Sequence, residues 1–217
     1  MCRFLVACGP RPFEPHPLLS AFAQMAETSR SPDGDRQADG CGVAWLDGDN
    51  TWQRIRSLAP IWQAHDAFAH APASRAIALH ARSASFPADR GYIEHNQPYL
   101  VGRHACVFNG LLTGVALPGR PGTVGAQRIA TLLGALLARH DAYRALPRLF
   151  AVLRARSRAI PACNLAICDS DGCAALCHFE DHPDYYQLHE AERDGARIVC
   201  SEPLPGMGWR PLPRTPR

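Results

Sequence analysis

The 217-residue chain is 47% hydrophobic and 20% charged, and its formal net charge is +3. This composition predicts one globular domain over residues 1–217 with a sizeable core, and it excludes a disordered chain. The small net charge, with no basic run interleaved with aromatic residues, gives no reason to expect nucleic-acid binding. All 23 basic residues are Arg, which excludes Schiff-base lysines and lysine-dependent phosphate loops.

The sequence contains no segment that predicts export or membrane insertion. The apolar stretch after Arg3 is much shorter than the apolar region of a secretory signal. The most apolar predicted helix, residues 129–138, is too short to cross a bilayer. We therefore expect a cytoplasmic protein that has no membrane partner and needs no cofactor.

Apolar runs and turn residues divide the first half of the chain into strands and short helices. Phe4–Ala7 reads as a buried strand that ends at the Gly9–Pro12 segment. The elements expected next are a helix over 17–26, a loop over 28–37, a hairpin of strands 43–46 and 51–55, a short helix over 61–69, a strand from 76 that runs into a polar loop by 85, a loop over 92–98, and strands 99–101 and 105–108. The second of these last two strands is expected to end at a turn made by Asn109-Gly110.

From residue 124 the apolar period becomes helical, and strands then return. We expect helices over 129–137 and 142–156, strands over 164–168, 173–179, 185–189 and 197–200, and an irregular proline-rich tail over 203–217. Strands, two central helices and further hairpins in this order predict an α+β fold with antiparallel sheets.

The nine cysteines are an odd number, which argues against a fully paired disulfide framework. Four of them lie close together in the sequence and next to His178: Cys163, Cys168, Cys173 and Cys177. They contain no CxxC pair, and Cys168 and Cys173 flank an Asp-Ser-Asp-Gly turn on two arms of a hairpin. We therefore expect small buried thiols and no metal site.

The second residue of the chain is a cysteine, and this position gives it a special chemical option. If Met1 is removed, the Cys2 thiol and a free α-amine lie on the same residue. The amine, whose reference pKa is about 8, can then act as the base for its own nucleophile. The strand that follows would hold this terminus rigidly in a sheet. Taken alone, Cys2 could equally be an accidental second residue.

Six short motifs along the chain are consistent with a catalytic Cys2. They are Cys2-Arg3, Asp39-Gly40-Cys41-Gly42, His80-Ala81-Arg82-Ser83-Ala84-Ser85, Asn96-Gln97-Pro98-Tyr99, Phe108-Asn109-Gly110 and Ser201-Glu202-Pro203-Leu204. In this order they resemble the class II glutamine amidotransferase family, and most of all its small stand-alone members, such as the γ-glutamyl hydrolase of ergothioneine synthesis. The resemblance covers nearly the whole chain. It implies the N-terminal nucleophile hydrolase fold, a four-layer αββα sandwich of two antiparallel sheets.

The resemblance also implies a role for each matched residue. Cys2 would supply the nucleophile and, through its amine, the base. The side-chain amide of Asn109 and the backbone N–H of Gly110 would stabilise the oxyanion. Arg82 resembles the clamp for the α-carboxylate of the substrate, a task that suits a guanidinium, and Ser85 stands where the family usually has Thr. His80 is expected to be a structural hydrogen-bonding residue, and Asp39-Gly40 to shape the mouth of the site.

The sequence departs from the family pattern at several positions. The family commonly has Trp at Cys41 and His at both Gln97 and Phe108. At the start of the central helix it usually has an acidic step whose Asp receives the α-ammonium of the substrate. Here that step is Gly125-Ala126-Gln127, so the residues for acyl transfer are present while the partner for the amino group is absent.

The leading hypothesis is a Cys2-dependent amidohydrolase that cleaves a glutamine-like or γ-glutamyl amide. The small-molecule amide substrate could lack a free α-amine, in keeping with Gly125. Plain hydrolysis is favoured, because a synthase that uses the ammonia would have to be a separate chain. The alternative is a degenerate domain that binds a ligand or partner without turnover.

Overall fold

The computed structural model describes residues 1–68 and 71–216 of the chain. Within these residues the strands form two antiparallel sheets. The seven-stranded sheet has the order β11-β9-β10-β1-β4-β2-β3, and the four-stranded sheet has the order β5-β6-β7-β8. The strand bounds are β1 Arg3–Phe13, β2 Cys41–Leu46, β3 Trp52–Ser57, β4 Ser74–Ala81, β5 Tyr99–Val101, β6 His104–Thr113, β7 Ala159–Cys168, β8 Cys173–Phe179, β9 His189–Arg193, β10 Ala196–Cys200 and β11 Arg210–Pro211.

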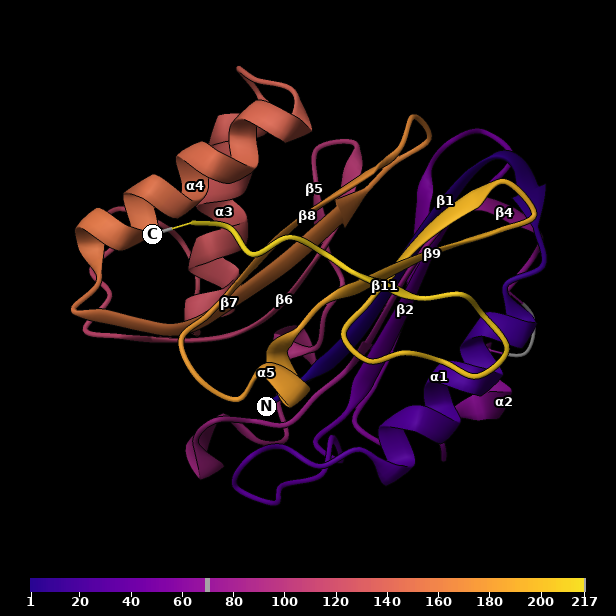
Figure 1. Ribbon diagram of the computed structural model, residues 1–217, viewed down its shortest axis with the longest axis horizontal. Helices are drawn as coiled ribbons and strands as arrows, with labels where there is room; N and C mark the ends of the chain where they lie inside the picture. The colour runs from indigo at the N-terminus through magenta and orange to yellow at the C-terminus, as the bar shows by residue number, and fades with distance from the viewer. Residues whose placement is uncertain (69–70, 217) are drawn as a thin grey trace.

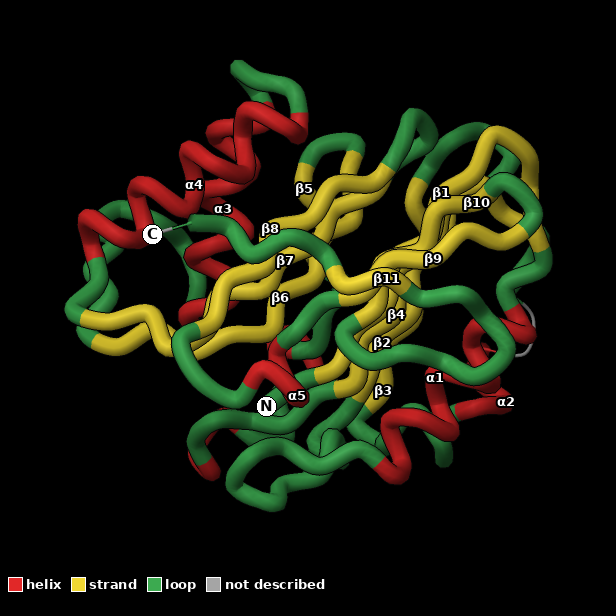
Figure 2. Tube along the Cα trace, in the orientation of Figure 1, coloured by secondary structure: helices red, strands yellow, loops and turns green. Residues whose placement is uncertain are grey.

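The long helices lie on the outer faces of the two sheets, whereas the short α5 packs against the layer between them. Their bounds are α1 His16–Thr28, α2 His65–Phe68, α3 Gly125–Leu137, α4 Ala142–Arg156 and α5 Pro183–Tyr186, and two 3₁₀ turns cover Pro87–Asp89 and Ile93–His95. Helices α3 and α4 cover the four-stranded sheet, and α1 lies against the seven-stranded sheet on the opposite side (Figure 1). The order helix, sheet, sheet, helix is also visible in the tube view (Figure 2). The predicted αββα sandwich is therefore confirmed.

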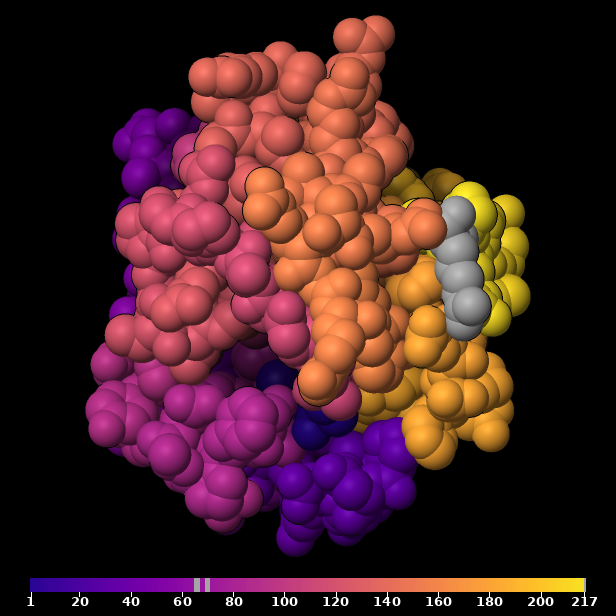
Figure 3. Space-filling view, turned by 90° about the vertical axis from the view of Figure 1, so that its left-hand side faces the viewer, coloured from indigo at the N-terminus to yellow at the C-terminus, as the bar shows by residue number. Residues whose placement is uncertain are grey.

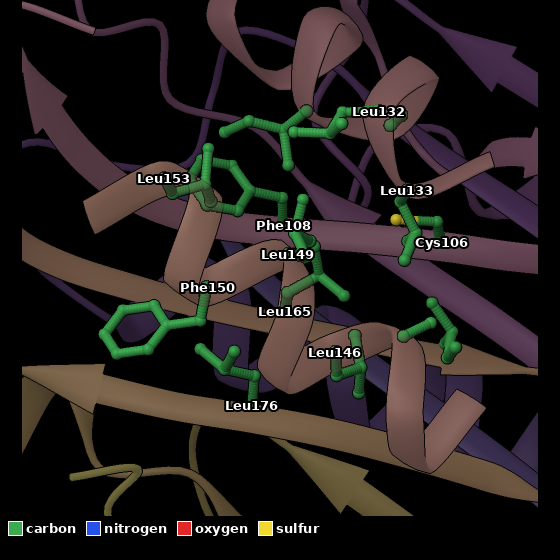
Figure 4. Packing of buried hydrophobic residues seen from close by; sticks show 14 of the residues in the cluster. Cys106, Phe108, Leu132, Leu133, Leu146, Leu149, Phe150, Leu153, Leu165 and Leu176 are labelled. Carbon is green, nitrogen blue, oxygen red and sulfur yellow. The ribbon is translucent and has the colours of Figure 1, made fainter. Parts of the chain in front are cut away.

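Three hydrophobic clusters fill the spaces between these four layers. The first joins α3 and α4 to the four-stranded sheet through side chains such as Leu133, Leu149 and Leu165 (Figure 4). The second packs α1 on the seven-stranded sheet. The third lies between the sheets. Strand alternation assigns each residue to one cluster: on β1, Leu5 faces α1 while Phe4 faces the other sheet.

The four clustered cysteines divide between two of these layers. Cys163 faces helices α3 and α4, whereas Cys168, Cys173 and Cys177 face the seven-stranded sheet. The nine cysteines, all within the described chain, are free thiols, and Cys168 pairs with Cys173 across the β7–β8 hairpin as predicted. In the part of the chain that the structure describes, no group of three or more His, Cys, Asp or Glu side chains is arranged to hold a metal ion.

Most predicted elements occur where the sequence placed them. Helix α4 and strand β8 have the predicted bounds, and the hairpin of β2 and β3 closes at Asp47–Asn50. The tail over 203–216 is irregular except for the short β11, while Ala69 of the predicted short helix lies outside the described residues. Across residues 1–68 and 71–216, no helix combines the length and apolar character needed to span a membrane.

Strand β1 continues through the segment that was expected to end it. Its pairing with β4 shifts register between Cys8 and Phe13, so the intervening residues leave the regular ladder. Because Pro10 and Pro12 lie in this unpaired bulge, their missing N–H groups cost no ladder hydrogen bond. The prediction of a chain break at Gly9–Pro12 was wrong.

Two further expectations were wrong. The Asn109-Gly110 pair does not make a turn, because β6 runs on to Thr113 and Asn109 pairs with Asn164 of β7. The predicted strand 185–189 is instead helix α5 followed by the start of β9 at His189. Pro183 at the first helical position favours this turn, since its fixed φ suits a helix start.

Arg3 connects the start of β1 to three distant segments. Its buried guanidinium donates at 2.8 Å to Ser29 Oγ, to the Tyr185 carbonyl and to the Ser201 carbonyl, and it lies 2.5 Å from the carboxylate of Glu202. It also stacks on the Tyr185 ring, 3.8 Å from the centroid. The Arg3 side chain therefore ties the first residues of the chain to these distant segments.

Replacing Arg3 with Met should lower the free energy of unfolding by about 3 kcal/mol, because it leaves the partly buried Glu202 carboxylate without its cation and two carbonyls without their donor. Arg210→Met is the matched control, since Arg210 pairs with Glu190 in an exposed contact of 3.4 Å; it should cost less than about 1 kcal/mol. Denaturant unfolding of the three proteins measures both values. Equal losses would show that Arg3 is not the anchor.

Candidate active site

A cavity of about 390 Å³ lies where the start of β1, the end of β4 and the middle of β6 meet. The space-filling view shows the N-terminal residues, in indigo, within a hollow framed by segments from the middle of the chain (Figure 3). The six residues that the sequence singled out all line this cavity: Cys2, Arg82, Ser85, Asn109, Gly110 and Gly125. Residues far apart in the chain are thus brought to one place, as the resemblance implied.

Cys2 lies at the cavity wall immediately before strand β1. Its thiol is 3.5 Å from the Ser83 carbonyl, and its backbone N–H donates to Asn109 Oδ1 at 3.1 Å. Met1 also lines the cavity, and its ammonium donates to Ser83 Oγ at 2.8 Å. Removal of Met1 would turn the Cys2 nitrogen into a free amine beside the thiol and would open space next to it.

Asn109 uses only one end of its side-chain amide. Its Oδ1 accepts from Cys2, while its Nδ2 is buried and has no hydrogen-bond partner among the described residues. Burying an amide donor without a partner costs about 1–3 kcal/mol. A buried polar group that stays unpaired in a native structure calls for an explanation, and a role in a ligand site is one. Asn109 reaches Cys2 because it follows Ala105 and Val107 on the face of β6 that looks toward the other sheet.

The backbone N–H of Gly110 is directed away from β7, toward the edge of β6 on which β5 pairs only with residues 104–106. The backbone of Phe108 exchanges two hydrogen bonds with the Gln97 side chain, at 2.6 and 3.0 Å, on the edge of β6 opposite β7. Since alternate residues of a strand direct their N–H groups to the same edge, Gly110 faces that edge too. A side chain at 110 would meet Ala162 O at 2.5 Å, so the position requires glycine.

Arg82 provides a buried positive charge in the cavity wall. It is only 5% exposed, and its guanidinium donates to the backbone carbonyls of Asp39 (3.5 Å) and Asp89 (2.6 Å). Within the described ranges, no carboxylate lies within ion-pair distance of the Arg82 guanidinium. The carboxylate of Asp39 pairs with Arg90 instead. The site can therefore accept an anionic group, and Ser85, exposed at the mouth, adds a hydroxyl.

His80 lies beneath this charge as a neutral side chain. Complete burial, followed by the neighbouring charge of Arg82, lowers the pKa of His80 to about 3. In the described chain neither ring nitrogen makes a hydrogen bond of good geometry, although the nearby Phe108 backbone offsets part of the pKa shift. An imidazole with this pKa carries no charge near neutral pH and is a poor general base.

The wall at the start of α3 contains no acidic side chain. Gly125 is the first residue of that helix, and an added Cβ there would have open space around it. Glu202, a carboxylate that could have replaced the missing acid, is instead bound to Arg3 and Ser29. Asp89 does line the cavity, and the sequence patterns did not single it out. Its 3₁₀ turn is formed by a polar loop without any motif, so no sequence signal marked it.

Comparison with solved structures identifies the fold. A glutamine aminotransferase class-II domain protein from Silicibacter pomeroyi has a TM-score of 0.65 at 21% identity, and the match covers 98% of this chain and 92% of that one. Glutamine phosphoribosylpyrophosphate amidotransferase of B. subtilis has a TM-score of 0.66 at 13% identity, over 98% of this chain and only 46% of the larger enzyme. No protein-family model and no curated protein matches the chain. The chain therefore has the fold of the class II glutamine amidotransferase domains, an N-terminal nucleophile hydrolase fold.

Proposed function

We propose that the protein is a Cys2-dependent amidohydrolase that cleaves the side-chain amide of a glutamine-like or γ-glutamyl substrate. The observation that carries the proposal is the contact between Asn109 and Cys2. The Asn109 side chain accepts from the Cys2 nitrogen and leaves its own NH₂ group buried and unpaired among the described residues, in the cavity that Cys2 also lines. This arrangement supports acyl transfer, because it positions an oxyanion donor next to a nucleophile.

The reaction begins with cleavage after Met1, which frees the α-amine of Cys2. The amine takes the thiol proton, and the thiolate attacks the carbonyl carbon of the substrate amide. Asn109 Nδ2 and the Gly110 N–H donate to the oxyanion that forms. Collapse of this intermediate expels ammonia or an amine, which takes the proton back, and leaves a thioester on Cys2. Water then hydrolyses the thioester and restores the thiol.

Substrate binding depends on Arg82 in this proposal. Its guanidinium has unused donors and no carboxylate partner among the described residues, which supports a bound carboxylate at this end of the cavity. The hydroxyl of Ser85 adds a donor nearby. The proposed reaction is hydrolysis, in which water is the final acceptor of the acyl group.

A non-catalytic binding domain is the second candidate, and one observation favours it. The α3 wall at Gly125 contains no acid, so amino-group recognition differs from that expected of the family. The arrangement of Cys2, Asn109 and Gly110 favours catalysis, because a domain that only binds a ligand has no need of an unpaired oxyanion donor beside a thiol. Turnover therefore separates the two candidates.

Labelling tests the nucleophile. Intact-mass analysis of protein incubated with iodoacetamide or a diazoketone analogue of glutamine should show a chain that begins at Cys2 with one rapid adduct. Cys2→Ala should lose both the rapid adduct and activity. Cys8→Ala, on the same strand, should retain the adduct because Cys8 is buried. Equal labelling of Cys2→Ala and the parent would refute a nucleophilic Cys2.

The two roles of Asn109 can be separated by substitution. Asn109→Asp keeps an oxygen that can accept from the Cys2 nitrogen but removes the NH₂ donor, while Asn109→Ala removes both. Each should lower kcat by about 10²–10³, with little change in KM, because the donor acts mainly in the transition state. Steady-state kinetics of both variants provides the measurement. A rise in KM alone would place Asn109 in ground-state binding.

Free glutamine should be a poor substrate, because the wall at Gly125 offers its ammonium no carboxylate. Initial rates with glutamine, a γ-glutamyl peptide and an N-acylated glutamine should be highest for the N-acylated compound. Gly125→Asp should move the preference toward free glutamine, and an acid in the first turn of a helix is also well tolerated.

Two variants serve as controls for this comparison. Gly48→Asp, in an exposed turn with open space around it, should leave the preference unchanged. Asp89→Asn should also leave it unchanged. The parent protein could turn over free glutamine efficiently while Asp89→Asn does not. That result would show that Asp89, and not the missing acid at Gly125, sets the specificity.

A further inference from the structure

Cys8 and Cys173 belong to different sheets but meet in the layer between them. Cys8 lies on β1, directly opposite Arg197 of β10. The Cys173 thiol, on β8, is 3.9 Å from the carbonyl of the same Arg197, and the Arg197 guanidinium donates back to the Cys173 carbonyl at 2.8 Å. Arg197 thus fixes both cysteines at one point between the sheets.

The sheets can approach closely here because the layer between them is made of small side chains. Half of its buried members are alanine or cysteine: Ala76, Ala78, Ala105, Ala162, Ala166, Cys8, Cys168, Cys173 and Cys177. Strands β1 and β8 come within 8 Å between Cα atoms. Packed sheets are usually about 10 Å apart, and a disulfide needs Cα atoms about 4.4–6.8 Å apart. The narrow spacing makes contact between the thiols feasible.

The two thiols have different electrostatic surroundings. A hydrogen bond with Cys8, together with the charge of Arg197, lowers the pKa of Cys173. The same hydrogen bond and burial raise the pKa of Cys8. Cys173 is thus the more readily ionised of the two thiols, and Cys8 is the one that keeps its proton. Cys8 and Cys173 are 6% and 5% exposed, so the pair is not completely sealed from solvent and from a small oxidant.

We propose that Cys8 and Cys173 form a redox-active pair that closes to a disulfide between the two sheets when the protein meets a hydroperoxide. The Cys173 thiolate attacks the terminal oxygen of the hydroperoxide and becomes a sulfenic acid, while the O–O bond breaks and an alcohol or water leaves. The sulfur of Cys8 then attacks the sulfenic sulfur, the S–S bond forms, and water leaves with the Cys8 proton. Two thiols are oxidised and one peroxide is reduced.

Cys168 is the nearest competitor for Cys173. It lies directly opposite Cys173 in the β7–β8 hairpin and faces the same layer. Its thiol, however, is directed to the Ile77 carbonyl at 3.5 Å, and burial raises its pKa well above the ordinary value. Cys8 is therefore the expected partner, and a Cys168–Cys173 bond is the alternative that the experiment must recognise.

The test uses Cys2→Ala protein, so that its outcome does not depend on the proposed nucleophile. Treatment with hydrogen peroxide, alkylation after denaturation and intact-mass analysis should show two fewer free thiols, reversed by dithiothreitol. Peptide mapping should identify the Cys8–Cys173 crosslink. Adding Cys8→Ser should leave a sulfenic acid on Cys173 that a cyclic 1,3-diketone traps. Adding Cys173→Ser should prevent both the crosslink and any adduct on Cys8.

Cys163→Ser is the matched control, because Cys163 is equally buried but faces helices α3 and α4; it should leave crosslinking unchanged. The mapping of the Cys2→Ala protein decides the question even if a serine variant folds poorly. Thiols that remain reduced under peroxide, or a mapped Cys168–Cys173 bond, would overturn the proposal. Neither result would bear on hydrolysis by Cys2.

Discussion

Everything at the candidate site depends on holding the first residues of the chain still. Chain ends usually fray, because few hydrogen bonds tie them down. Here β1 pairs with β10 on one side and β4 on the other, so the terminal strand is central in its sheet. Arg3 then joins it to Ser29, Tyr185, Ser201 and Glu202. A cysteine one residue before such a strand therefore has a fixed position.

Charge in the cavity is arranged around the buried guanidinium of Arg82. Among the described residues Arg82 donates only to carbonyls, and His80 beside it is neutral because burial and the Arg82 charge lower the pKa of His80 to about 3. The start of α3, with the positive end of a helix dipole and no acidic residue, adds to the positive potential. A substrate with a free ammonium would enter this field unfavourably, whereas a carboxylate with an uncharged nitrogen substituent suits it.

The sequence predicted the periodic parts of this structure well and the context-dependent parts poorly. Helix α4 and the β7–β8 hairpin follow from apolar period and a turn, both local signals. Asn109-Gly110 was misread as a turn because its local signature is overridden by pairing with Asn164, a partner far along the chain. The six site residues could be named only through ordered motifs. No local sequence pattern marks Asp89 as a cavity residue or Cys8 as a neighbour of Cys173, because both placements depend on long-range packing.

The layer between the sheets links these observations. Cys2 directly precedes β1 of the seven-stranded sheet and Asn109 belongs to the four-stranded sheet, yet the Cys2 backbone nitrogen lies 3.1 Å from the Asn109 side chain. An asparagine side chain is short, so this contact requires the sheets to be close together at that point. Alanines such as Ala78 and Ala105 permit that spacing, and larger side chains there would force the sheets apart or strain their rotamers. The packing that lets Cys8 meet Cys173 is the same packing that brings the oxyanion donor to the nucleophile.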